Sequence, residues 1–129
     1  MRPDRFAAIL CASLALCSCA PSAPPAPPTP TVDAAAVERG RLVYQVEACA
    51  ACHGERGEGT EVAPALTGLA AHWQGDELAA FLIDPAPALG SDPRLAEMAA
   101  RFVLEMPGVA KASSGDVADL VEYLLSGLE

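Results

Sequence analysis

Residues 49–54 read Cys-Ala-Ala-Cys-His-Gly, or CAACHG, and place a histidine directly after two cysteines that are separated by two small residues. The whole chain has five cysteines and two histidines, so this stretch concentrates side chains that are scarce elsewhere. Three chemistries use such a spacing: disulfide exchange, a structural metal site and covalent attachment of haem. The sequence on either side discriminates among them.

Two of these chemistries need features that the chain lacks. A disulfide oxidoreductase with a C-x-x-C pair is built on a βαβ pattern, and no segment here alternates convincingly as a strand. A structural zinc site needs about four protein ligands. Cys49, Cys52, His53 and His72 could supply them, but zinc fingers rarely place a histidine directly after the second cysteine.

Covalent haem attachment fits the motif residue by residue, because C-x-x-C-H is the attachment signature of c-type haem. The thiols of Cys49 and Cys52 can add to the two vinyl groups of one porphyrin, and the two-residue spacer lets both reach the same edge. His53 can then bind the iron from one face, while Ala50 and Ala51 are too small to crowd the ring. The motif therefore predicts one covalent haem c.

The opposite face of the iron has three candidate ligands. Met106 precedes a Pro-Gly pair, which should end any helix and leave the thioether in a loop that can turn inward. Met98 lies within an expected helix and is more simply a core side chain. His72 is more simply a surface or hydrogen-bonding residue. We favour Met106 and keep Met98 and His72 as alternatives.

The first residues have the features of an export signal. Two arginines precede the apolar run 6–16, which is too short for a bilayer-spanning helix of about 20 residues. The stretch LCSC at 16–19 resembles the bacterial lipobox, and this resemblance implies a signal peptide at 1–18 and lipidation of Cys19. The residue after Cys19 is not aspartate, which by resemblance to lipoprotein sorting in enteric-type bacteria favours the outer membrane.

Residues 19–32 are expected to connect the lipid to the folded domain. Positions 20–32 contain six prolines, which fix the backbone and remove N–H donors. Such a segment is a semi-rigid spacer that reaches on the order of 35–40 Å. We therefore expect a domain at 33–129 that is held by lipid on the extracytoplasmic, periplasmic side of the membrane.

The domain shows helical periodicity and no convincing strand. The expected helices are one before the motif that Asp33 caps, one at 76–83, one at 92–105 and one after Ser113. Ser113 and Asp116 have the spacing of a capping box. The apolar face of the last helix is expected to bury Val117, Leu120, Val121, Leu124 and Leu125. The domain is therefore predicted to be all-α.

The charge of the chain restricts its partners. The formal net charge is −9, and residues 33–129 contain six basic and sixteen acidic side chains. Such a surface argues against binding to nucleic acid or to an anionic membrane surface. We expect a redox partner protein with basic docking patches.

Taken together, these features resemble small monohaem bacterial cytochromes c, which share the mitochondrial cytochrome c fold. The resemblance covers about residues 36–127. Gly40 and Tyr44 match the early glycine and aromatic residue of that family, and Tyr123 matches the aromatic residue of its last helix. The resemblance implies an all-α cytochrome c-like fold of about four short helices around one covalently attached haem.

The same resemblance implies roles for two further residues. Pro64 in APALTG matches the proline whose carbonyl oxygen accepts a hydrogen bond from the ligand histidine, and Met106 matches the methionine ligand. It implies a one-electron carrier rather than an enzyme. The alternatives are a gas sensor or peroxidase-type site with a labile sixth ligand, and a fixed haem subunit of a larger oxidoreductase.

Overall fold

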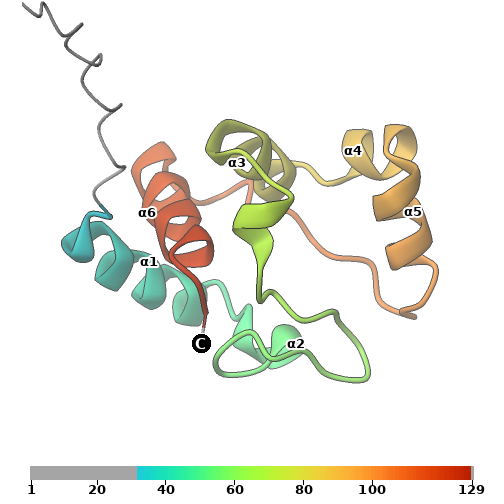
Figure 1. The fold of residues 1–129 in the computed structure, drawn as a ribbon, viewed down its shortest axis with the longest axis horizontal. Helices are drawn as coiled ribbons and strands as arrows, with labels where there is room; N and C mark the ends of the chain where they lie inside the picture. Colours follow the sequence, from blue (N-terminus) through green and yellow to red (C-terminus); the bar gives the residue numbers. More distant parts are fainter. Residues whose placement is uncertain (1–31, 129) are drawn as a thin grey trace, which may run out of the picture.

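The computed structural model describes residues 32–128, and every regular element within them is a helix (Figure 1). The predicted all-α class is thereby confirmed. The expected signal peptide at 1–18 and lipidated Cys19 lie outside the described residues, as does nearly all of the tether at 19–32. Within the described part of the chain, no helix has the length and apolar character needed to cross a membrane.

Seven helical elements follow one another along residues 32–128. They are α1 (Ala34–Val46), α2 (Ala50–His53), the 3₁₀ helix η1 (Leu69–Ala71), α3 (Gly75–Ile83), α4 (Ala86–Ser91), α5 (Pro93–Ala99) and α6 (Ser114–Leu125). In Figure 1, α1 crosses α6 on one side of the molecule, α3 packs beside α6, and α4 and α5 pair on the far side. The one-turn helix α2 and the short helix α4 were not expected from the sequence.

The first and last helices begin at the residues that the capping signals indicate. The carboxylate of Asp33 accepts a hydrogen bond from the N–H of Ala35 at 3.0 Å. The hydroxyl of Ser113 accepts from the N–H of Asp116 at 3.1 Å, and the carboxylate of Asp116 accepts from the N–H of Ser113 at 3.2 Å. These bonds satisfy backbone donors that have no partner within the helix.

Helix α5 is shorter than expected, and the prediction of a helix over 92–105 is wrong at its C-terminal end. The helix ends at Ala99, where the N–H of Arg101 bonds to the carbonyl oxygen of Met98, three residues back, at 3.1 Å. Such bonds tighten and close a last turn. Beyond this point, burial of apolar side chains does not stabilise a longer helix, since Val103 is 95% exposed.

Helix α4 was not expected from the sequence, because Pro87 and Gly90 disfavour a helix interior. The carboxylate of Asp84 accepts a hydrogen bond from the N–H of Ala86 at 3.3 Å, which supports the helix start. Pro85 and Pro87 fall at this start, where a helix does not need their missing N–H groups. Pro85, which follows the end of α3, is therefore also the residue at which α4 begins.

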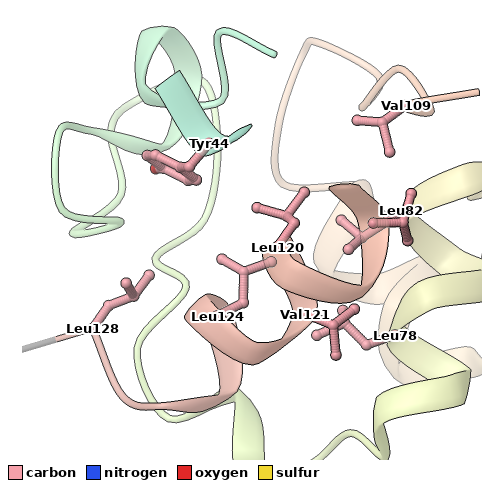
Figure 2. Packing of buried hydrophobic residues seen from close by; sticks show 9 residues of the cluster. Tyr44, Leu78, Leu82, Val109, Leu120, Val121, Leu124 and Leu128 are labelled. Carbon is pink, nitrogen blue, oxygen red and sulfur yellow. The ribbon is translucent and has the colours of Figure 1, made fainter. Parts of the chain in front are cut away.

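The hydrophobic core lies where α6 packs between α1 and α3 (Figure 2). The buried cluster comprises Tyr44, Leu78, Leu82, Val109, Val117, Leu120, Val121, Leu124 and Leu128. Leu125, which was expected to be buried, is only partly buried and packs at the edge of this cluster. So few buried side chains make a thin core, as is usual for a domain of this size.

Helices α1 and α6 cross closely at Gly40. A Cβ atom on Gly40 would lie 2.6 Å from the carbonyl carbon of Asp119 and 2.7 Å from the Cβ atom of Tyr123. The guanidinium of Arg39 donates two hydrogen bonds to the carboxylate of Asp119, at 2.6 and 2.8 Å. The rings of Tyr44 and Tyr123 meet edge to face, with centroids 5.6 Å apart. The glycine is required here because any side chain would separate the two helices.

We expect Gly40→Ala to lower the free energy of unfolding by about 1–3 kcal/mol, the usual cost of overpacking. Gly90→Ala in α4 is the matched control, because a Cβ atom there would have no neighbour within 4 Å. The control should be neutral or slightly stabilising, since alanine favours a helix. Urea unfolding of the haem-loaded protein measures both variants. Equal unfolding midpoints for Gly40→Ala and the wild type would contradict the close crossing.

Candidate functional site

A tight turn at the end of α1 leads directly into the CAACHG motif. Ala48 has a φ of 57°, in the left-handed region. The N–H of Cys49 bonds to the carbonyl oxygen of Tyr44 at 3.0 Å, and the N–H of Ala48 bonds to that of Gln45 at 3.1 Å. This pair of bonds is the Schellman motif, in which glycine normally occupies the left-handed position. The turn ends α1 and leads directly to Cys49, the residue before α2.

The two cysteines are both free and half-buried. Cys49 packs against the core cluster, and burial raises the pKa of its thiol, so that the thiol is neutral near pH 7. Cys52 follows three residues later around the single turn of α2, which places both side chains on neighbouring positions of one helix face. The motif thus presents two thiols side by side.

His53 is the one buried polar or charged side chain among residues 32–128, at 8% exposure. Its Nδ1–H donates a hydrogen bond to the carbonyl oxygen of Pro64 at 2.8 Å. This bond fixes the tautomer and orientation of the imidazole and leaves Nε2 available as a ligand. The structure therefore brings together His53 and Pro64, as the resemblance implied.

Tyr44 holds the end of α2 from the side of α1. Its hydroxyl donates to the carbonyl oxygen of Gly54 at 2.7 Å, and its side chain is 1% exposed. Burial raises the pKa of this phenol well above its usual value, so it remains a neutral donor. From the sequence, Tyr44 was identified only as a match to the early aromatic residue of the family. The hydrogen bond adds a direct connection between the first helix and the haem-binding motif.

Thr60 is a residue that the sequence analysis missed. Its hydroxyl donates to the carbonyl oxygen of Cys52 at 2.5 Å. The last carbonyl groups of a short helix have no partner within the helix, and a threonine or serine side chain in the following loop can supply one. The only indication in the sequence was that Thr60 directly follows the glycine-rich stretch GERGEG at 54–59.

Met106 lies in an irregular segment between α5 and α6, half-buried and packed against the core cluster. Two backbone contacts fix the residues after it. The N–H of Val109 donates to the carbonyl oxygen of Leu82 at 2.7 Å, and a Cβ atom on Gly108 would lie 3.0 Å from the carbonyl carbon of Ile83. The end of α3 therefore determines where the Met106 segment runs.

The alternative ligands have different surroundings. Met98 on α5 is half-buried but is not among the residues that pack against the core cluster, so its expected place in the core is wrong. His72 is exposed, as expected. No three His, Cys, Asp or Glu side chains between residues 32 and 128 converge into a group that could hold a metal ion. The zinc alternative therefore has no assembled ligand set.

The residues of the motif fit a c-type haem. Two free thiols share one face of α2, and the histidine beside them has its Nδ1 occupied by a backbone carbonyl. This donor set suits two thioether bonds and one iron–imidazole bond. A thiol pair for disulfide exchange would need no such histidine, and the described residues contain no strand to carry a thioredoxin-like site.

A sequence model of the family described as cytochrome c matches residues 37–127, which is well over half of the chain. A comparison with curated proteins found no match, and a comparison with solved structures found none. The matched range includes the CAACHG motif, Pro64, Met106, most of α1 and all of α6.

The bond from Tyr44 to Gly54 can be tested with a matched pair of variants. We expect Tyr44→Phe to lower the free energy of unfolding by about 1 kcal/mol, the net value of one hydrogen bond. Tyr123→Phe should change it little, because the Tyr123 hydroxyl makes no hydrogen bond within residues 32–128. Chemical denaturation of the haem-loaded proteins gives both values, and an equal loss in the two variants would refute a specific role of the Tyr44 hydroxyl.

Proposed function

The chain belongs to the cytochrome c family, and we propose that it is a monohaem, membrane-tethered carrier of single electrons. Members of this family are electron-transfer proteins that bind haem c covalently. One C-x-x-C-H motif in the chain corresponds to one haem. Proteins of this family are typically extracytoplasmic.

The bond between His53 and Pro64 is the observation that carries this proposal. Haem c, when bound, supplies an iron that takes up and releases one electron. In the proposed site Cys49 and Cys52 would form the two thioethers, and His53 Nε2 and the Met106 sulfur would bind the iron. A carbonyl bond to Nδ1 orients the imidazole and increases its basicity, and a methionine ligand raises the reduction potential.

The surroundings of the site support a carrier rather than an enzyme. His53, the single buried polar side chain between residues 32 and 128, donates a hydrogen bond to Pro64 and is the iron ligand in this proposal. No buried carboxylate, lysine or second histidine in this range stands ready as a general acid or base. Met106 sits on a segment whose continuation is bonded to α3, which favours a ligand that stays in place.

The acidic surface supports a partner with basic docking patches. Four of the six basic residues between 32 and 128 already pair with carboxylates of this chain: Arg39, Arg41, Arg94 and Arg101. Most remaining surface charge is therefore negative. Opposite charge on a partner speeds association, and salt screens this attraction. We infer that electron transfer to its redox partner slows as ionic strength rises.

The N-terminal residues support tethering to a membrane. The lipobox-like LCSC and the proline-rich stretch after it suit a signal peptide at 1–18, a lipid on Cys19 and a spacer at 19–32. The domain would then stand off from the membrane on the periplasmic side, and we place it on the outer membrane. Stable anchoring of this kind needs more than one acyl chain.

We expect Met106→Ala to keep the covalent haem but to lower its reduction potential and let the ferrous protein bind CO. The reason is that the variant removes a thioether ligand that favours the ferrous state. Met98→Ala is the control and should leave the potential and the spectrum unchanged. Visible spectra in both oxidation states, with and without CO, measure the effect in protein expressed with a haem-maturation system.

Two results would contradict the proposed carrier. Ready binding of CO by the wild type would indicate an open iron and favour a sensor or peroxidase-type site. If Met98→Ala rather than Met106→Ala opens the iron, the assigned ligand is wrong.

We expect Cys19→Ala to release the protein from the membrane fraction or to stall removal of its signal peptide, because no other position of the LCSC stretch fits lipidation as well. Cys17→Ala is the matched control and should remain membrane-bound. Fractionation of the bacterial host, with mass spectrometry of the N-terminal peptide, measures both. Unchanged fractionation of Cys19→Ala would exclude the lipid anchor.

A further inference from the structure

The loop after α2 folds back onto the helix that precedes it. The carbonyl oxygen of Cys52 accepts the Thr60 hydroxyl at 2.5 Å, and the carbonyl oxygen of His53 accepts the N–H of Gly59 at 2.7 Å. Both carbonyls belong to the last residues of a one-turn helix and have no acceptor role within it. The loop is thus bonded to the two residues that form the end of the haem motif.

Thr60 also closes the turn that leads to Pro64. Its N–H donates to the carbonyl oxygen of Ala63 at 2.9 Å, and its Oγ1 accepts from the N–H of Val62 at 3.2 Å. The next residue, Pro64, receives the Nδ1–H of His53 at 2.8 Å. A segment of five residues is therefore attached at both ends to consecutive residues of α2.

Among the described residues, Thr60 is the only member of the segment 60–64 whose own side chain hydrogen-bonds to a residue outside it. The neighbouring anchors are backbone bonds, from Gly59 to His53 and from Leu66 to the carbonyl oxygen of Gly57 at 2.7 Å. Pro64 has no N–H with which to hold its own position. The orientation of its carbonyl group consequently depends on the turn in front of it, and a substitution at Thr60 can loosen that turn without changing the haem motif.

We propose that Thr60 is a positioning residue for His53, acting through the Pro64 carbonyl group. The inference rests on the proposed function, because it assigns His53 as the iron ligand. By fixing the 60–63 turn, the hydroxyl keeps the Pro64 oxygen in line with Nδ1–H, which holds the imidazole orientation and its basicity. A stronger bond at Nδ1 favours the ferric state, so weakening it raises the reduction potential.

The test compares Thr60→Val, which keeps the branched shape and removes the hydroxyl, with Thr60→Ser, which keeps the hydroxyl. In the ferrous haem-loaded protein, NMR measures solvent exchange of the His53 Nδ1 proton, and a spectroelectrochemical titration measures the potential. Thr60→Val should exchange this proton roughly fivefold faster, the factor that one net hydrogen bond represents, and should have a higher potential. Thr60→Ser should match the wild type in both.

Several outcomes overturn the proposal. If Thr60→Val matches the wild type in both proton exchange and reduction potential, the hydroxyl does not position His53. A lower unfolding midpoint with both readouts unchanged shows a role in stability alone. Loss of haem from Thr60→Val and Thr60→Ala, with Thr60→Ser normal, shows a role in folding instead.

The proposed carrier function can fail separately. If the wild type binds CO readily, the carrier assignment is wrong. The role of Thr60 is then still decided by comparing the variants in two measurements: proton exchange in the diamagnetic CO complex and the reduction potential of the CO-free protein.

Discussion

The close crossing of α1 and α6 at Gly40 is the constraint on which the rest of the structure depends. The missing side chain lets the backbone of α1 approach the Asp119 carbonyl group, and the Arg39–Asp119 ion pair and the Tyr44–Tyr123 contact lie beside the crossing. Because Arg39 is largely exposed, its ion pair contributes little to stability on its own. The close fit of the two helices at Gly40, rather than this ion pair, determines the crossing. The crossing joins the two ends of a domain that has a small hydrophobic core.

From this crossing, a short series of hydrogen bonds extends to the functional motif. Tyr44 is buried against α6, and its backbone carbonyl and its hydroxyl bond to Cys49 and Gly54, on either side of α2. The motif is thus held at both ends by one residue of α1. This arrangement places Ala48 in the left-handed region, where alanine destabilises the fold by about 1 kcal/mol relative to glycine. The hydrogen bonds and burial around Tyr44 offset it.

The parts of the fold that the sequence predicted are those that local chemistry determines. The caps at Asp33 and Ser113 act over two or three residues, so they could be read directly from the sequence. The end of α5 depends on which side chains are buried, and α4 depends on the position of Pro85 and Pro87 at its start. Neither feature was expected from the sequence. Pro64 was found through a family resemblance, whereas the role of Thr60 depends on a contact across eight positions that no periodicity encodes.

The two proposed ligands are held by different parts of the molecule. His53 is buried and bonds to Gly59 and Pro64, and the residues on either side of α2 bond to Tyr44 of α1. Met106 is instead fixed chiefly through residues that follow it and contact α3. The segment before Met106 is loosely packed, with Val103 almost fully exposed. Regions with few buried contacts open at lower free energy than the core. In the folded protein the bond from Val109 to Leu82 holds the methionine side in place. When the protein begins to unfold, we expect this side to open before the histidine side, which is next to the two thiols.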